Sequence, residues 1–253
     1  YDVASQHHSE LFTFDASKDN VKVVSATEEN AYPGTFMHRT MAVIKEESFE
    51  KPYLLDIMRV TSDSENQYDL PFYYLGQVID NNFDYQSPTS LHPLGEENGY
   101  QHLYVEGKGS AVEGNTKFSW LGAGKYYTLT MLTDAQDDIY LTRIGANDPE
   151  FNLRREAGIM LRREKTQDTV FVSVVEPHGS YSPVSESSKN SKSSIAKLEL
   201  VLNSAKYTGV SIVDVKGKTQ LFIIANSDNS DTAEHAVTID GETYRWTGPY
   251  FYQ

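Results

Sequence analysis

Two histidines and one aspartate of this sequence have the chemistry of a metal site. Asp56 lies among apolar residues in a strand-like run, and a buried carboxylate is costly unless it is paired or bound to a metal. His38 begins the expected neighbouring antiparallel strand, so His38 and Asp56 can meet across a sheet. His102 is the best third partner, with His92 as the alternative. Such a set suits Zn²⁺. The competing interpretation is an ion pair from Asp56 to His38 or Arg59.

A tyrosine-rich segment over residues 67–77 offers a second kind of chemistry. Pro71 interrupts it, and a proline has no N–H for a sheet ladder, so we expect an edge strand or a loop over a cleft. Tyr73 follows two positions later. A phenol with an ordinary pKa of about 10 acts as a base at neutral pH only beside cations. Plain aromatic packing is the competing interpretation.

Basic residues concentrate beyond residue 150, just after the turn-forming Asn147-Asp148-Pro149: Arg154, Arg155, Arg162, Arg163 and Lys165. A guanidinium pairs with a carboxylate through two parallel hydrogen bonds, so this cluster can steer an acidic ligand. Two other interpretations stay open. The arginines are strand-surface residues balanced by Glu156 and Glu164, or the whole stretch from 144 to 155 docks another domain.

Glu176 and His178 stand two residues apart and suggest acid–base chemistry at first sight. They end an apolar, strand-like run, and we interpret them as a structural turn. The sequence contains no phosphate-binding glycine loop, no Gly-x-Ser-x-Gly elbow and no His-Glu-x-x-His helix, which removes nucleotide, serine hydrolase and metalloprotease functions from consideration.

The elements that position these residues are strands. Apolar and polar residues alternate over many short runs separated by turn signals such as Asp240-Gly241, and no amphipathic helix exceeds two turns. The expected strands are 11–14, 21–24, 53–60, 103–106, 126–132, 139–143, 159–162, 169–175, 196–202, 210–215, 220–225 and 235–239. We predict an all-β fold, a large antiparallel two-layer β-sandwich, as a single domain over residues 1–253. The Ser-, Lys- and Pro-rich stretch 180–194 is an expected exposed loop.

Composition limits the partners. The 253 residues carry a net charge of −14, which disfavours non-specific binding to nucleic acid. The chain has no cysteine, so disulfides are excluded. No apolar run approaches the roughly 18 residues that span a bilayer. The first residue is Tyr1 rather than Met, and no signal peptide follows, which suggests processing or truncation.

The chain resembles the C-terminal β-sandwich domain of the heparinase II/III-like polysaccharide lyases, most closely the alginate and oligoalginate lyases of polysaccharide lyase family seventeen. The resemblance extends from about Ala31 to about Tyr181. Its most specific stretches are Gly99-Tyr100-Gln101-His102-Leu103, Trp120-Leu121-Gly122 followed by Tyr126-Tyr127-Thr128, and Gly145-Ala146-Asn147-Asp148-Pro149.

This resemblance implies a function that the residues alone do not. Family members join an N-terminal α/α toroid to such a sandwich and cleave uronate polymers by β-elimination. Their Asn-His pair and principal tyrosine lie on the toroid, which this chain lacks, so we expect the chain alone to be inactive. Tyr73 matches the tyrosine that the β domain lends to the cleft, and Arg39 and Arg59 are the expected substrate contacts. The family's structural zinc, held by His, Asp and His, maps onto His38, Asp56 and His102.

The implied partners are an acidic polysaccharide such as alginate, the toroid and, in a homodimer, a second copy. The implied location is the periplasm or the outside of the cell. A function from another class is the alternative, namely a stand-alone carbohydrate-binding or interaction sandwich.

Overall fold

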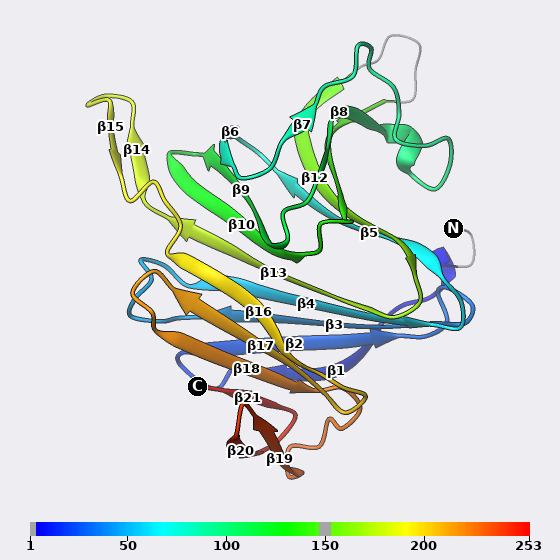
Figure 1. Cartoon of the computed structure of the whole chain (residues 1–253), viewed down its shortest axis with the longest axis vertical. Coiled ribbons are helices and arrows are strands. Elements are labelled where there is room, and N and C mark those ends of the chain that lie inside the picture. The colour runs from blue at the N-terminus through cyan, green and yellow to red at the C-terminus, as the bar shows by residue number, and fades with distance from the viewer. Residues whose placement is uncertain (1–3, 147–152) are drawn as a thin grey trace.

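A computed structural model describes residues 4–146 and 153–253, which form antiparallel sheets with almost no helix (Figure 1). None of the helices in these ranges is long and apolar enough to cross a membrane. The elements are η1 (Ala4–Gln6), β1 (Glu10–Asp15), β2 (Val21–Glu28), β3 (Thr35–Ile44), β4 (Tyr53–Ser62), β5 (Asn66–Tyr74), β6 (Gln77–Asn81), β7 (Tyr85–Gln86), η2 (Tyr100–His102), β8 (Leu103–Ser110), β9 (Gly114–Gly122), β10 (Lys125–Thr133), β11 (Asp138–Gly145), β12 (Leu153–Thr166), β13 (Thr169–His178), β14 (Ser180–Ser182), β15 (Ser187–Lys189), β16 (Ile195–Asn203), β17 (Tyr207–Asp214), β18 (Thr219–Ala225), β19 (Glu234–Ile239), β20 (Glu242–Thr247) and β21 (Tyr250–Tyr252).

Three sheets build the sandwich, and the largest is shared. The eight-stranded sheet has the order β1-β2-β3-β4-β13-β10-β9-β6, the five-stranded sheet β5-β12-β11-β8-β7, and the four-stranded sheet β16-β17-β18-β21. Figure 1 shows the four-stranded sheet below the large sheet and the five-stranded sheet above it. The prediction of a large antiparallel β-sandwich is confirmed, and the structure adds that the two smaller sheets cover opposite faces of the large one.

Alternation along β13 explains how one sheet serves two cores. Val170, Val172 and Val174 belong to the core shared with the four-stranded sheet, whereas Phe171 belongs to the core shared with the five-stranded sheet. Successive side chains of a strand point to opposite faces, so a strand buried on both faces is apolar throughout. The sequence shows this directly in the continuous run 169–175.

The edges of the sheets also follow from sequence. The tyrosine-rich segment forms β5, the edge strand of the five-stranded sheet, and Pro71 sits in it opposite Met160. The predicted loop over 180–194 contains a short exposed hairpin, β14–β15, that projects from the body in Figure 1. Strand β9 was not expected, because its outward positions are polar and only Thr116, Phe118 and Trp120 carry its inward pattern.

Arg163, which we considered a strand-surface residue, is buried. Its Nε lies 3.1 Å from both carboxylate oxygens of Asp137, and its Nη atoms donate to Thr169 Oγ1 and to the carbonyls of Val170 and Leu132 at 2.9 to 3.0 Å. The guanidinium also lies 4.5 Å from the centre of the Phe171 ring. This side chain therefore joins β12 to β10, β13 and the turn that precedes β11.

We predict that Arg163→Ala lowers the free energy of unfolding by about 3–5 kcal/mol, because it leaves the Asp137 carboxylate buried and unpaired. Urea unfolding followed by circular dichroism measures this loss. Lys197→Ala is the control, since Lys197 pairs with Glu199 on the surface and such pairs contribute about 0–1 kcal/mol. Equal stability of the two variants would contradict the prediction.

Candidate functional site

The predicted metal ligands do not come together. In the β3–β4 ladder His38 stands opposite Arg59, and Asp56 stands opposite Met41. Because neighbouring positions alternate between faces, His38 and Asp56 lie on opposite faces of the eight-stranded sheet. His102 belongs to η2, beside the five-stranded sheet, and His92 is an exposed residue of the loop before η2. The expected contact between His38 and Asp56 is therefore wrong, and these residues do not fit one zinc ion as a set.

Asp56 is satisfied by an arginine. Its carboxylate accepts from Nε and Nη2 of Arg39 at 3.0 and 2.7 Å, and its side chain is 4% exposed against 45% for Arg39. The ion-pair interpretation of Asp56 thus describes the structure, but the partner is Arg39 rather than His38 or Arg59. Within residues 4–146 and 153–253, no three His, Cys, Asp or Glu side chains gather closely enough to hold a metal ion.

His38 and Arg59 face the four-stranded sheet. His38 Nε2 lies 2.6 Å from Ser25 Oγ, and its ring packs 4.6 Å from the ring of Phe12. Arg59 donates from Nη1 to Asn203 Oδ1 at 2.7 Å. Burial, assisted by the charge of Arg59, lowers the pKa of His38 to about 4. Arg39 and Arg59, the two expected substrate contacts, therefore lie on opposite faces of one sheet and cannot serve one site.

We predict a pH-dependent stability that originates in His38. Its pKa is about 4 in the folded protein against 6.5 in the unfolded chain, so the stability is complete above pH 6.5. As the pH falls from 6.5 towards 4, His38 becomes protonated in the unfolded chain but not in the folded protein. The free energy of unfolding therefore falls by about 3 kcal/mol. Urea unfolding across this range should show a shallower loss in His38→Gln. The exposed His92→Gln is the control and should follow the unmodified chain; a His38→Gln profile parallel to both would contradict the assignment.

Tyr73 lies on the outer face of the five-stranded sheet and is 54% exposed. It stands opposite Gly158, and a Cβ at that glycine would come within 3.3 Å of Tyr73 Cδ1, so the missing side chain lets the phenol ring lie against the sheet. Partial burial raises the pKa of Tyr73 above its usual value. The phenol therefore stays protonated at neutral pH, which suits a proton donor better than a base.

A polar cluster on the same outer face was missed by sequence reasoning. Arg162 donates from Nε and Nη2 to Asp69 at 2.8 Å each, and Tyr100 donates its hydroxyl to the same carboxylate. The Arg162 guanidinium also lies 4.7 Å from the centre of the Tyr140 ring. Arg162 and Asp69 are directly opposite in the β12–β5 ladder, a relation that no sequence spacing reveals. The cluster fixes η2 on the sheet and leaves Arg162 fully engaged.

One region of the eight-stranded sheet, which we call the open face, carries exposed apolar side chains. It consists of the side of β1–β3 that points away from the four-stranded sheet. Its apolar side chains Leu11, Phe14, Val24 and Val43 are between 40% and 67% exposed, and Arg39 lies among them. A contiguous exposed apolar surface of this kind marks an interaction site in a soluble protein.

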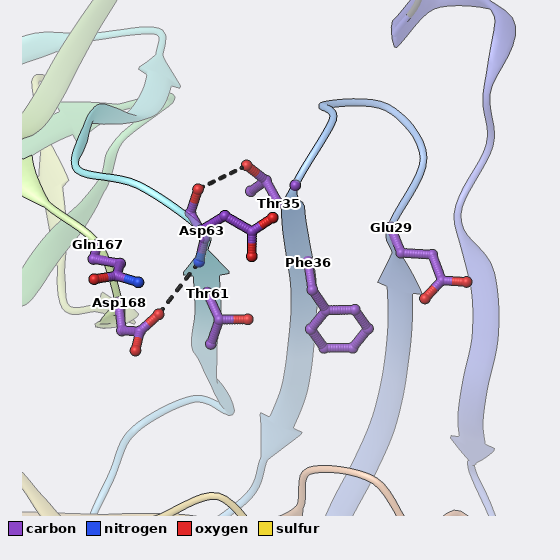
Figure 2. Close-up of a pocket in the computed structure, with 9 residues that line it drawn as sticks. Glu29, Thr35, Phe36, Thr61, Asp63, Gln167 and Asp168 are labelled. Carbon is purple, nitrogen blue, oxygen red and sulfur yellow. Dashed lines mark hydrogen bonds between the residues drawn. The ribbon is translucent and has the colours of Figure 1, made fainter.

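Two cavities at one end of the described structure are acidic. A cavity of about 370 Å³ near the β2–β3, β4–β5 and β12–β13 turns is lined by Glu29, Asp63 and Asp168, with no basic residue in its wall (Figure 2). A neighbouring cavity of about 460 Å³ shares Asp168 and includes Arg163, which is already bound to Asp137. These cavities repel an anion, so this end of the molecule does not suit a uronate ligand.

The sequence is similar to two alginate lyases over nearly the whole length of this chain. The chain is 33% identical over 245 residues to an alginate lyase of Stenotrophomonas maltophilia (strain K279a) and 30% identical over 249 residues to an exo-oligoalginate lyase of Saccharophagus degradans (strain 2-40 / ATCC 43961 / DSM 17024). These matches cover 96% and 97% of this chain, but the chain spans only 33% of the length of each relative. No protein-family model matches it.

Two solved structures of heparinase III share the fold. Each superposes with a TM-score of 0.51, at 8% and 11% sequence identity, over 86% and 85% of this chain and 28% and 27% of the other protein. These superpositions show that a part of heparinase III has the same antiparallel β fold as this chain. By sequence the chain is a homologue of about one third of each of the two alginate lyases, and the resemblance indicated by its sequence is confirmed.

Proposed function

We propose that this chain is the C-terminal β-sandwich portion of a polyuronate lyase that cleaves alginate or a related polymer by β-elimination. The observation that carries the proposal is the near-complete match of the chain to only one third of two alginate lyases. Such a portion needs a surface that contacts the rest of the enzyme. The open face of β1–β3 supplies exposed apolar side chains, as a domain interface requires.

The proposed partner on the open face is an α/α toroid, which completes the cleft. We had expected the stretch from 144 to 155 to dock it, but the centre of that stretch, residues 147–152, lies outside the described residues. The open face is the better supported surface because its exposed apolar side chains all lie among the described residues. A polymer of charged sugars does not cross a bilayer unaided, so we also propose a periplasmic or extracellular location.

Tyr73 is the residue that we propose for chemistry. β-Elimination removes the C5 proton of a uronate, neutralises the carboxylate and protonates the leaving oxygen. A half-exposed phenol with a raised pKa can donate that last proton. Arg39 is the proposed carboxylate contact: it lies half-exposed on the open face, and Asp56 engages its Nε and Nη2 but not its Nη1. Arg59 has no place in this site, because it points to the other face of the sheet.

We predict that the chain alone does not cleave oligoalginate, because the principal base lies on the proposed toroid. The measurement is the ultraviolet absorbance of the unsaturated uronate product during prolonged incubation. The S. maltophilia alginate lyase named above serves as the positive control. Sustained turnover by the isolated chain would refute the division of catalytic labour proposed here.

A chimera tests Tyr73 directly. This chain replaces the matching third of the S. maltophilia enzyme, and we expect lyase activity to return. In that chimera Tyr73→Phe should lower kcat by about 10²–10⁴-fold, the usual contribution of a positioned proton donor. Tyr244→Phe, on the distant β19–β20 hairpin, should leave kcat unchanged. If the chimera is active and Tyr73→Phe leaves its kcat unchanged, Tyr73 has no role in the reaction. The relation of the chain to alginate lyases would be unaffected by that result.

A further inference from the structure

Three aromatic side chains form what we call the aromatic row: Trp120 of β9, Tyr127 of β10 and Tyr74 at the end of β5. Trp120 stacks on Tyr127 with 5.3 Å between ring centres and 13° between planes, and Tyr74 lies 5.4 Å from Trp120. All three are partly exposed. In Figure 1 the end of β5 lies beside β6 and β9, where the five-stranded and eight-stranded sheets face each other. The row continues the core beyond the buried Phe118 and Leu129.

The polar tips of the row find no partner in the described parts of the chain. Within the described residues, neither the indole N–H of Trp120 nor the hydroxyls of Tyr74 and Tyr127 make a hydrogen bond. A buried tyrosine or tryptophan usually finds such a partner, so three unused groups on one partly exposed surface point to a ligand or solvent. An aromatic face with a hydrogen-bonding edge matches a pyranose ring, which has an apolar C–H face and hydroxyls around its rim.

A planar ion pair borders the row. Arg143 donates from Nε and Nη2 to Glu106 at 2.9 and 3.0 Å, and its Nη1 donates to the carbonyl of Arg155 at 2.9 Å. Both side chains are about one third exposed. Burial, aided by the charge of Glu106, raises the pKa of Tyr74 to about 12 against the opposing effect of Arg143, so its hydroxyl remains a donor. Such a pair offers donors and acceptors in the geometry of vicinal sugar hydroxyls.

Unpaired positive charge lies at the same end. Arg154 and Arg155 are exposed, and neither has a carboxylate within 4.0 Å in the described parts of the chain. The carbonyl of Arg155 accepts from Arg143 Nη1, and Ala157, two positions later, stands opposite Tyr74 in the β12–β5 ladder, so Arg155 lies next to the ion pair that borders the row. Arg39, Arg162 and Arg163 are each bound to an aspartate.

We propose that the aromatic row is a binding site for an acidic oligosaccharide, with a pyranose ring packed against the exposed parts of the stacked Trp120 and Tyr127 rings and its carboxylate paired with Arg155. The Arg143–Glu106 pair receives the ring hydroxyls. This site is separate from Tyr73, because Tyr73 and Tyr74 point to opposite faces of β5. It goes beyond the proposed lyase function, since it needs residues of this chain alone and cleaves no bond.

Fluorescence can test the proposal on the full chain. Its only tryptophans are Trp120 and Trp246, and Trp246 lies in a separate aromatic cluster with Tyr207 and His235. In Trp246→Phe the signal comes from Trp120 alone. We expect saturable quenching or a spectral shift on titration with oligoalginate. In Trp120→Phe the remaining Trp246 should not respond.

Substitutions then separate stacking from charge. In the Trp246→Phe background, Tyr127→Ala should weaken binding by about tenfold or more, equivalent to about 1.4 kcal/mol. Arg155→Ala should weaken oligoalginate but leave a neutral (1→4)-linked mannan oligosaccharide unaffected. Tyr32→Ala and Arg245→Ala, exposed residues far from the row, are the matched controls, and circular dichroism verifies the fold of each variant.

No saturable response of Trp120 at millimolar oligoalginate would overturn the proposal, as would a response that survives Tyr127→Ala unchanged. A neutral oligosaccharide that loses affinity equally in Arg155→Ala would overturn the role of the carboxylate. The lyase chimera keeps this result distinct from the proposed function: an active chimera beside a chain that binds no sugar rejects the aromatic row alone.

Discussion

The structure depends on the burial of both faces of β13. Its valines at 170, 172 and 174 pack against the four-stranded sheet, and Phe171 packs against the five-stranded sheet. A slip of one residue would exchange the two sets, so both cores resist it together. Because each small sheet is held against this common strand, β13 also fixes where the open face, Tyr73 and the aromatic row lie relative to one another.

The distribution of charge decides what the surface can bind. A chain with a net charge of −14 repels a polyanion at long range, so any affinity for one must come from contacts within the screening length of roughly 8–10 Å. Three arginines are bound by aspartates, two of them in largely buried ion pairs. The pockets at one end are lined by carboxylates, whereas the exposed Arg154 and Arg155 stand at the other. Among the described residues, the exposed positive charge of Arg154 and Arg155 is therefore the feature that best suits an acidic sugar.

The sequence predicts much of the fold and less of the site. Alternation located most strands, and Pro71 correctly placed β5 at an edge, because both signals act within a few residues. The predicted contact between the metal ligands His38 and Asp56 is wrong for a different reason. His38 and Asp56 do lie on adjacent strands, but their positions in the ladder differ in parity, and parity is decided by register. The partner of Asp56 proved to be Arg39, a residue that the sequence had assigned to substrate.

The sequence by itself determined the strand content, the largely apolar run 170–175 of β13 and the relation to alginate lyases, since these reside in local pattern and in residue identity. Only the tertiary structure decided which arginines are neutralised, which face Tyr73 occupies and that Tyr74, Trp120 and Tyr127 form one surface. The physical reason is that the sequence of a strand indicates which residues share one face of the sheet, but not which element packs against that face. Register and the packing of one sheet on another assign the partner, and both are set by contacts between residues far apart in the chain.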